Sequence, residues 1–356
     1  MKRVIIGLIG ALVLLLLVGA SLYIYPVENF LFRHMADRAV SKPATVLAAP
    51  RQLSVLLCGT GTPLPDKSRA GPCTLIAAGD KYYLVDAGID TARNLRLWQI
   101  PMEKIAGILI THFHSDHIAE LGEMRLQTWA SGRKTPLPVY GPPGVERVVA
   151  GFNEAYALDA GYRTAHHGAK MLPPDAVAMI AKPIAFAGAT GPVLKQNGLT
   201  ITAIRVHHDP ATPAYGYRFD FSGRSIVVSG DTIADQNLAH AAKGVDVLVH
   251  EALSPEMVGA LGAALAAHGQ WRSAKIMHDI PAYHTSPVDA ARIANEAGAR
   301  LLVYTHLLPV LPDELAERLF LRGVSDVRSD GVIVGKDGLL IRLGAGSKKI
   351  EQSMLE

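Results

Sequence analysis

The chain has 356 residues, of which 49% are hydrophobic and 19% are charged, and this composition is typical of a globular protein with a well-buried core. General disorder is therefore excluded. The net charge is +3 and no run of basic residues is present, so the sequence offers no electrostatic footprint for nucleic acid.

The first segment that stands out is apolar. Residues 4–25 form a stretch of 22 residues without a charge, which is long enough to span a hydrocarbon core of about 30 Å. Val18, Gly19 and Ala20 would suit a signal-peptide cleavage site, but the apolar stretch continues beyond them. Residues 1–26 are therefore predicted to be a transmembrane signal-anchor helix, with a cleaved signal peptide as the alternative.

Basic residues on the two sides of this segment bear on its orientation. Lys2 and Arg3 precede it, whereas Arg33, Arg38 and Lys42 follow it at a greater distance. This pattern favours a cytoplasmic tail and an inner-membrane anchor, with the catalytic domain on the periplasmic side. A cleaved and secreted form is the alternative.

Residues 27–50 read as a short helix followed by a linker, and the folded domain is expected over residues 51–356. Short β-branched segments alternate with turn signals. The expected strands are 53–59, 73–79, 81–88 and 105–112, followed by a second series at 199–208, 215–223, 224–231, 245–251 and 301–306. Expected helices lie at about 90–100, 118–131 and 144–158, and a helical insert is expected at about 142–195. Two such series predict an α/β fold, an αββα sandwich with helices outside two packed sheets.

Three local features add detail. A helix over 287–298 is predicted from Ser286 as N-cap, Pro287 at the first position and Gly298 as the stop signal. The segment 331–343 reads as a β-hairpin on an Asp-Gly turn. Cys58 and Cys73 lie on consecutive expected strands, and we favour two buried free thiols over a disulfide, although the sequence leaves both open.

The sequence THFHSDHIAE (111–120) contains the residues that are most strongly expected to bind metal. His112 and His114 are two residues apart after a buried strand, so both imidazoles are expected to point the same way. Asp116 and His117 follow in the first turn of the next helix. Four nitrogen and oxygen ligands within ten residues exceed the need of one tetrahedral zinc with an open position, so the cluster predicts two metal ions.

Further ligands are available where later strands end. His207 and His208 follow the strand that begins at residue 199, and only one of them can face the cluster. Asp231 follows RSIVVSG, where its carboxylate could bridge two cations. His306 ends LLVYTH in the same manner.

These motifs together resemble the metallo-β-lactamase superfamily, in the branch of ribonuclease Z and the arylsulfatase-like hydrolases. The resemblance covers roughly residues 53–310. Its motifs are GTGTPLP (59–65), LVDAG with Asp86, the histidine cluster, LPVYGPPG (137–144), AYGYRF (214–219), SGDT (229–232), VHEA (249–252), YHTSP (283–287) and Thr305-His306.

The resemblance implies a set of ligands for two divalent metal ions. His112, His114 and His208 would hold the first ion, Asp116, His117 and His306 would hold the second, and Asp231 would bridge them. His208 is preferred over His207 from its distance to Pro213–Tyr217. Ligands without cysteine favour zinc, with manganese or iron as alternatives.

The expected mechanism is hydrolysis by a hydroxide that bridges the two metal ions. Asp116 would orient the water or accept its proton. His284 in YHTSP and His250 in VHEA are candidates for the proton donor to the leaving oxygen, with Glu251 orienting an imidazole. Asp86 is expected to brace a metal-bound histidine.

The substrate is less closely defined. Ribonuclease Z enzymes of the short kind carry a long arm between the third-motif His and the bridging Asp, whereas only 22 residues separate His208 from Asp231 here. A small sulfate or phosphate ester, or diester, is therefore expected, and nucleic acid is not. The alternatives are tRNA 3′ processing, opening of a lactone or β-lactam, and a metal-binding, membrane-tethered sensor without turnover. The resemblance also suggests a homodimer.

Overall fold

The computed structural model describes residues 2–41 and 44–355, and the chain divides into two compact units, residues 1–44 and 45–356. The first unit consists of α1 (Lys2–Val40), which continues through Pro26, where a shorter helix had been expected to begin. Within α1, residues 9–38 are long and apolar enough to cross a membrane, a test that signal sequences also pass. Lys42 and Pro43 of the predicted linker lie outside the described residues.

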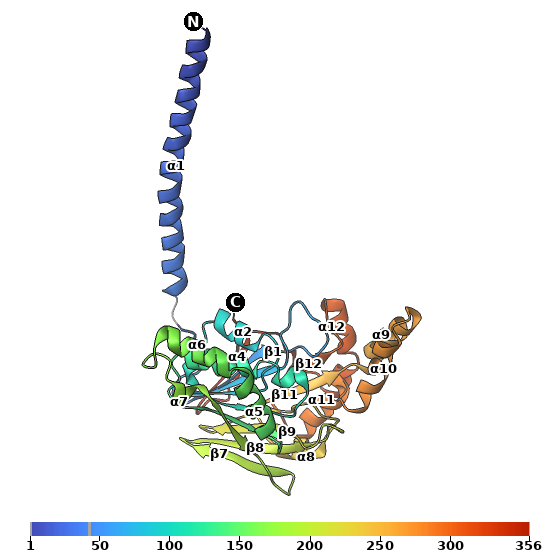
Figure 1. The fold of residues 1–356 in the computed structure, drawn as a ribbon. Coiled ribbons are helices and arrows are strands. Elements are labelled where there is room, and N and C mark those ends of the chain that lie inside the picture. Colours follow the sequence, from blue (N-terminus) through green and yellow to red (C-terminus); the bar gives the residue numbers. More distant parts are fainter. Residues whose placement is uncertain (1, 42–43, 356) are drawn as a thin grey trace. The chain divides into compact units, whose positions relative to one another are not determined.

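The second unit contains two β-sheets, with helices on their outer faces (Figure 1). The first sheet has the order β15-β14-β1-β2-β3-β4-β5-β6. Its strands are β1 (Gln52–Gly59), β2 (Cys73–Ala78), β3 (Lys81–Val85), β4 (Ile105–Leu109), β5 (Leu137–Gly141), β6 (Met179–Pro183), β14 (Leu339–Gly344) and β15 (Glu351–Met354).

The second sheet has the order β13-β12-β11-β10-β9-β8-β7. Its strands are β7 (Thr190–Gln196), β8 (Leu199–Val206), β9 (Ala214–Phe221), β10 (Arg224–Val228), β11 (Val247–Leu253), β12 (Leu301–Leu308) and β13 (Val332–Val334).

Short helices and turns of helix connect the strands. They are α2 (Thr91–Leu97), η1 (Met102–Lys104), α3 (Ser115–Ile118), α4 (Leu121–Ala130), α5 (Val145–Ala155), α6 (Ala157–His167), α7 (Pro174–Val177), α8 (Gln236–Ala241), α9 (Pro255–Ala267), α10 (Trp271–Asp279), η2 (Ile280–Ala282), α11 (Pro287–Glu296), α12 (Glu314–Phe320) and α13 (Val324–Val327).

The apolar core explains this layering. Side chains from both sheets, such as Val55, Tyr83, Phe219 and Val303, meet in one buried cluster between the sheets. A further buried cluster lies between the first sheet and its helices, and another lies between the second sheet and its helices. Strands β3 to β6 are parallel to one another, and so are strands β10 to β13, as expected for sheets covered on both faces. The predicted αββα sandwich is confirmed.

The predicted hairpin over 331–343 is wrong. β13 pairs in parallel with β12 in the second sheet, whereas β14 pairs with β1 in the first sheet. Asp337, at the expected turn, instead accepts hydrogen bonds from the Thr60 hydroxyl (2.7 Å) and the Ala70 amide (2.6 Å). These long-range bonds fix the crossing between sheets, which a local turn signal cannot reveal.

Two other expectations change. The favoured free thiols are wrong, because Cys58 on β1 and Cys73 on β2 form a disulfide with a Cα–Cα separation of 5.0 Å. The insert at about 142–195 does contain helices α5 to α7, but it ends in β6 and β7. These two strands extend one edge of each sheet. The helix predicted over 287–298 is present as α11, with the Ser286 hydroxyl accepting from the Asp289 amide.

An ion-pair cluster links the first residues of β10 with the residues that precede β11 and β12. Asp246 accepts hydrogen bonds from Arg224 Nε (2.9 Å), the Ser225 amide (3.0 Å) and Arg300 Nη1 (2.8 Å). Burial alone would raise the pKa of this carboxyl, but these partners lower the pKa below its ordinary value.

We predict that Asp246→Asn lowers the free energy of unfolding of the second unit by about 1.5–3 kcal/mol at neutral pH, because charged hydrogen-bond partners lose their acceptor. A lowered folded-state pKa contributes stability above the unfolded value of about 3.9, and this contribution is lost as the pH falls through the folded pKa. Urea unfolding at pH 7 and in acid should therefore show the difference shrinking in acid. Asp80→Asn, at an exposed pair with Lys81, is the control with little effect; a pH-independent difference would contradict the assignment.

Candidate metal centre

The histidine cluster lies just beyond the end of β4. The chain leaves the sheet after Leu109, so His112 and His114 lie in the connecting loop, and Asp116 and His117 belong to α3. All but His114 are buried. One short segment thus presents four ligand-type side chains at the edge of the first sheet.

The second sheet supplies three more such side chains. His208 follows β8 and Asp231 follows β10. The preceding Gly230 has φ +62°, and a Cβ there would come within 2.6 Å of the Tyr215 carbonyl oxygen, so this approach requires glycine.

His306 reaches the site by a different route from the one expected. β12 does not end there but continues to Leu308, and the register with β11 shifts at His306. His306 has φ +47°, a strained conformation for a residue with a side chain. The resulting bulge turns its imidazole toward the other ligands.

Three imidazoles converge on the position expected for the first metal ion. His112 Nε2 lies 2.9 Å from His114 Nδ1, and His208 Nε2 lies 3.4 Å from the same atom. Together these three side chains form a group of ligand atoms close enough to share one cation.

Asp231 connects this group to a second one. Its Oδ2 atom lies 4.0 Å from His112 Nε2 and 3.8 Å from His208 Nε2. The same oxygen is 3.4 Å from His117 Nε2 and 3.3 Å from His306 Nε2. Asp231 is therefore at the position that a bridging carboxylate would occupy.

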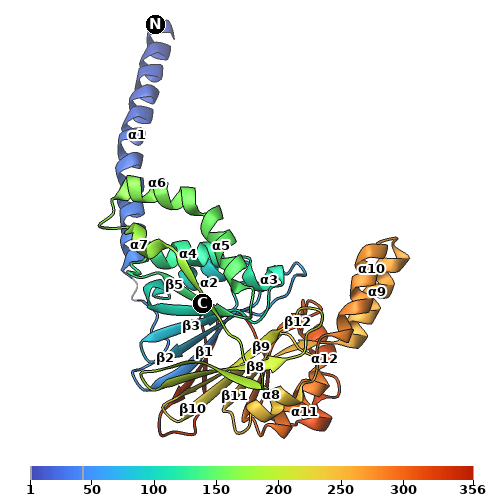
Figure 2. The same ribbon diagram turned by 60° about the horizontal axis from the view of Figure 1, so that its bottom comes forward.

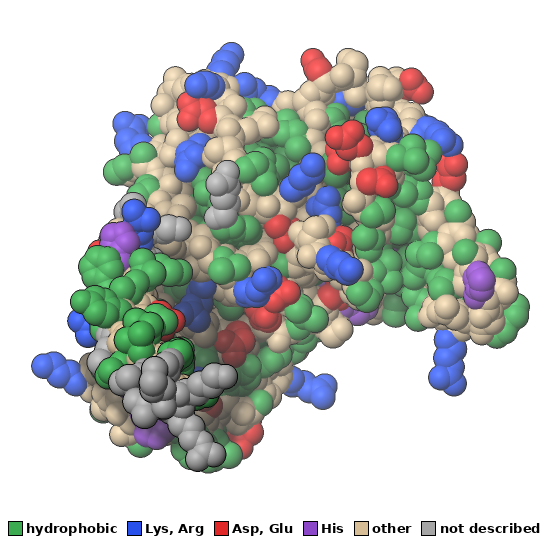
Figure 3. Space-filling model, turned by 90° about the horizontal axis from the view of Figure 1, so that it is seen from above, with side chains coloured by type: hydrophobic (Ala, Val, Ile, Leu, Met, Phe, Trp, Pro, Cys, Tyr) green, Lys and Arg blue, Asp and Glu red, His purple; other side chains and the backbone are tan. Residues whose placement is uncertain are grey.

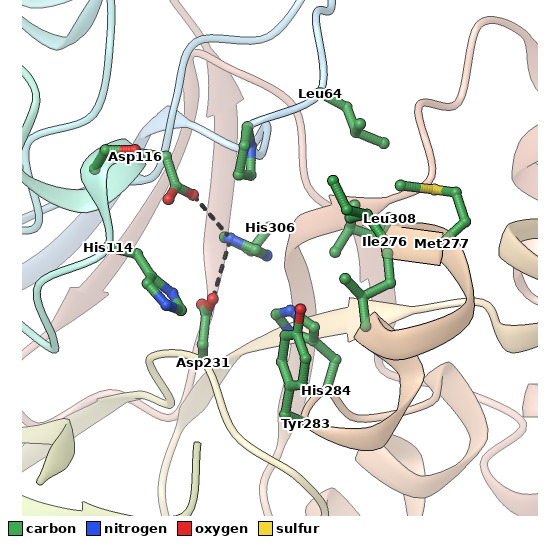
Figure 4. Close-up of a pocket in the computed structure, with 13 residues that line it drawn as sticks. Leu64, His114, Asp116, Asp231, Ile276, Met277, Tyr283, His284, His306 and Leu308 are labelled. Carbon is green, nitrogen blue, oxygen red and sulfur yellow. Dashed lines mark ion pairs between the residues drawn. The ribbon is translucent and has the colours of Figure 1, made fainter. Parts of the chain in front are cut away.

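Asp116 completes the second group. Its Oδ2 lies 3.4 Å from both His117 Nε2 and His306 Nε2, and the three side chains form another group with metal-binding geometry. All seven ligand candidates from the sequence thus come together. Figure 4 shows four of them around the cavity.

Unsatisfied atoms test whether this arrangement fits a metal. Asp116 Oδ2, His117 Nε2 and both ring nitrogens of His306 are buried, yet they form no hydrogen bond within the described part of the chain. A buried polar atom without a partner costs about 1–3 kcal/mol. Divalent cations bound between these atoms would remove that cost, so the residues present fit a pair of metal ions.

The choice between the adjacent histidines follows from burial. His208 is 2% exposed and faces the cluster. The side chain of His207 is 57% exposed and contacts Asp235 at 2.5 Å, away from the cluster. The geometry favours His208, as the resemblance implied.

Further polar groups orient the imidazoles. Asp86 Oδ2 accepts a hydrogen bond from His117 Nδ1 (2.8 Å), as expected for a bracing carboxylate. His208 Nδ1 donates to the Tyr283 carbonyl oxygen (2.9 Å). With Nδ1 occupied, the Nε2 atoms of both rings are directed into the site.

His284 and Glu251 form a pair at the margin of the site. Glu251 Oε1 lies 3.1 Å from His284 Nδ1 and also accepts from the Thr285 amide at 3.0 Å. The Glu251 carboxylate raises the pKa of His284 against the opposing effect of burial. His284 lines the cavity, so it can touch a bound substrate.

His250 does not fit its expected role as a proton donor. It is fully buried, its Nδ1 contacts the Glu251 carbonyl oxygen at 2.7 Å, and it is not among the residues that line the cavity. In a strand, neighbouring side chains point to opposite faces, so Glu251 faces the site and His250 does not.

The pKa shifts of His112 and Asp231 suit cation binding, whereas that of His117 opposes it. Burial lowers the pKa of His112 well below its ordinary value, and the adjacent His117 lowers it further. Burial by itself would raise the pKa of Asp231, but His306 and His117 lower it well below the usual range. Burial would lower the pKa of His117, but the carboxylates of Asp231 and Asp86 raise it well above its ordinary value. Because metals bind neutral imidazoles and ionised carboxylates, His117 has to release a proton when a cation binds.

The site opens into a cavity of about 260 Å³ whose far side is apolar. The apolar lining residues include Leu64, Ile276, Met277 and Leu308. Sequence reasoning missed this wall, because apolar residues on helices predict core packing and carry no functional motif. Two motifs from the sequence lie near this wall, since GTGTPLP (59–65) contains Leu64 and YHTSP (283–287) follows α10 closely.

Comparison with known families and proteins gives consistent results. Residues 81–307 match the family described as "Beta-lactamase superfamily domain". A protein named Ribonuclease Z from Mycobacterium bovis (strain BCG / Pasteur 1173P2) is 37% identical over 263 residues, which cover 73% of this chain and 87% of that protein.

Solved structures share the fold at low sequence identity. The metallo-beta-lactamase fold protein YhfI from Bacillus subtilis aligns over 82% of this chain and 100% of its own, with a TM-score of 0.58 and 22% identity. Human tRNase Z, short form, aligns over 83% and 100%, with a TM-score of 0.58 and 18% identity.

We predict that the full chain purified with zinc holds about two ions and that Asp231→Ala lowers this number clearly, because the bridging carboxylate is lost. Zinc should also raise the unfolding temperature of the wild type more than that of the variant, a readout that does not depend on activity. His207→Gln is the matched control, since His207 points away from the cluster. A single ion retained unchanged by Asp231→Ala would contradict the bridging geometry.

Proposed function

Because the chain belongs to the metallo-β-lactamase superfamily, in the branch of ribonuclease Z, and is thus a metal-dependent hydrolase of ester bonds, we propose that it cleaves phosphodiesters at a pair of divalent metal ions. The observation that carries this proposal is the single Asp231 oxygen within 4.0 Å of four imidazole nitrogens. Nitrogen and oxygen ligands favour zinc, with manganese or iron as alternatives.

Each group of ligands has an assigned role. Such metal pairs supply a nucleophilic water at neutral pH and polarise the bond under attack. We assign the first position to His112, His114 and His208, the second to Asp116, His117 and His306, and the bridge to Asp231. Asp116 also faces the cavity, so its carboxylate can orient a water molecule and accept its proton.

We assign the proton donor to His284. Its ring lies 5.1 Å from that of His208 and 5.5 Å from that of His306, measured between centroids, at the edge of the cavity. Glu251 accepts a hydrogen bond from His284 Nδ1. This bond leaves His284 Nε2 free to point toward the substrate. If His284 protonates the leaving oxygen, it acts as a general acid.

The first candidate substrate is RNA. The relatives named Ribonuclease Z support this choice, since the 37% identity extends over most of both chains. The small sulfate ester that the sequence suggested first finds less support than this phosphodiester alternative, and the expectation that nucleic acid is not a partner is weakened accordingly.

A small phosphodiester is the second candidate, and one observation favours it. The residues between His208 and Asp231 form only a turn and the paired strands β9 and β10. The segment therefore has no described element that could act as a long RNA-gripping arm. A compact substrate needs no such arm.

We also propose that the catalytic unit is exported and held at the membrane by α1. The apolar length of this helix supports an anchor. The Cys58–Cys73 disulfide is typical of oxidising compartments, which supports the periplasmic side.

We predict that the metal-loaded full chain hydrolyses bis(p-nitrophenyl) phosphate, and that chelation or Asp116→Ala lowers kcat at least about 100-fold, the lower range for loss of a general base. A pre-tRNA substrate assayed in parallel ranks the two candidates. Preferential turnover of an aryl sulfate, lactone or cephalosporin would replace the proposed substrate class. Metal binding without any turnover would support a sensor instead.

We predict that alkaline phosphatase fused after Glu356 is active in cells and that a green fluorescent protein fused there is dark, because the catalytic unit lies outside the cytoplasm. Replacement of Lys2 and Arg3 by Glu removes the positive charge that precedes the apolar stretch. This change should reduce the fraction of molecules whose catalytic unit lies outside the cytoplasm. A fluorescent fusion with inactive phosphatase would contradict export.

A further inference from the structure

The cavity beside the metal-binding residues points to a substrate class, and this step rests on the proposed phosphodiesterase activity. We propose that the cavity binds an amphiphilic phosphodiester, with the phosphate at the metal-binding residues and an apolar alkyl or aryl group against the wall formed by α10, η2, β12 and the loop after β1. We call this surface the apolar wall; it consists of Leu64, Ile276, Met277, Ile280 and Leu308.

The two sides of the cavity differ in chemistry. His114, Asp116, Asp231 and His306 lie on one side, and the apolar wall lies opposite (Figure 4). A substrate whose phosphate reaches Asp116 and Asp231 therefore places a neighbouring substituent against hydrocarbon. Burying an apolar group there is favourable by about 25 cal/mol per Å² removed from water.

The charge of the lining favours the second candidate, a small phosphodiester, over RNA. The residues that line this cavity include no Lys or Arg. A polyanion such as RNA carries another phosphate at each nucleotide, and none of these would find a cation at this lining. The cavity thus suits a single phosphodiester group flanked by an uncharged, apolar substituent.

Close packing holds the residues of the apolar wall in place. Met277 and Ile280 are buried and pack with Leu253, Val258 and Leu308 in one apolar cluster. α9 supports them from behind, where Gly262 approaches Met277 so closely that an added Cβ would lie 3.1 Å from the Met277 Cβ. The position of α10 is therefore set by close packing, and its side chains are held at the cavity.

Ile276 marks the mouth of the cavity. It lines the cavity and is also 54% exposed, whereas a large apolar side chain in a core would be covered. α9 and α10 project from the body of the second unit (Figure 2), and hydrophobic side chains cover much of this projection at the right of Figure 3. Leu261 and Trp271 are exposed there, so an apolar chain longer than the cavity meets further apolar surface.

The test compares two diesters that release the same leaving group. The full chain is assayed with zinc, in the same detergent throughout, on methyl p-nitrophenyl phosphate and on hexyl p-nitrophenyl phosphate. The hexyl ester is kept below the concentration at which it forms micelles. We expect kcat/KM for the hexyl ester to exceed that for the methyl ester at least about tenfold, because a single methylene in an apolar pocket already changes this ratio by about 10-fold or more.

Variants then locate the preference. Ile276→Asn should lower kcat/KM for the hexyl ester about tenfold and leave the methyl ester nearly unchanged. Leu158→Asn, at an exposed apolar position on α6 that does not line the cavity, is the matched control and should change neither value. Equal rates for both esters, or an Ile276→Asn effect that is the same on both, would overturn the inference.

A binding measurement separates this inference from the proposed activity. Dihexyl phosphate and dimethyl phosphate are titrated by calorimetry against the zinc-loaded chain, which requires no turnover. Tighter binding of dihexyl phosphate that is lost in Ile276→Asn supports the apolar wall even if neither ester is hydrolysed, in which case the proposed phosphodiesterase activity alone fails. Chelator-sensitive hydrolysis with equal binding of both phosphates would retain that activity and overturn the amphiphilic substrate.

Discussion

The two sheets bring one buried carboxylate, that of Asp231, together with the imidazoles around it. One oxygen lies within 4.0 Å of nitrogens on His112, His117, His208 and His306, and several of the buried atoms around it have no hydrogen bond in the described part of the chain. Such a group is costly unless cations bind it. The two sheets, the glycine before Asp231 and the bulge at His306 all serve to bring these atoms to one place.

The seven residues that the sequence offers as ligands come together in the structure, and their role as ligands stays a prediction. A buried strand followed by His-x-His-x-Asp-His has few structural uses. The expected geometry was wrong in one respect, because His112 and His114 lie in the loop after β4 and not on a strand whose period of two would align them. Asp231 was a candidate in the same way, because it follows a strand of regular length, whereas the choice of His208 over His207 came from the family resemblance. His306 does reach the site, but the expected strand end was wrong, since a bulge depends on pairing with β11.

Features set by distant contacts were not predictable in this way. The segment 331–343 has a good turn sequence, yet Asp337 is held by Thr60 and Ala70 across the molecule. His250 and Glu251 differ only by one position in β11, and this register decides which of them faces the site. The pairing of Cys58 with Cys73 required the spatial distance between adjacent strands. The apolar residues of α10 belong to no motif of the sequence analysis, although Leu64 of the apolar wall lies in GTGTPLP.

If the seven residues hold two metal ions bridged by Asp231, anomalous diffraction from zinc-soaked crystals of the chain should reveal both ions. We expect two peaks roughly 3.5–4 Å apart, one beside His112, His114 and His208 and the other beside Asp116, His117 and His306, with Asp231 between them. A single peak, or peaks that Asp231 does not contact, would contradict it.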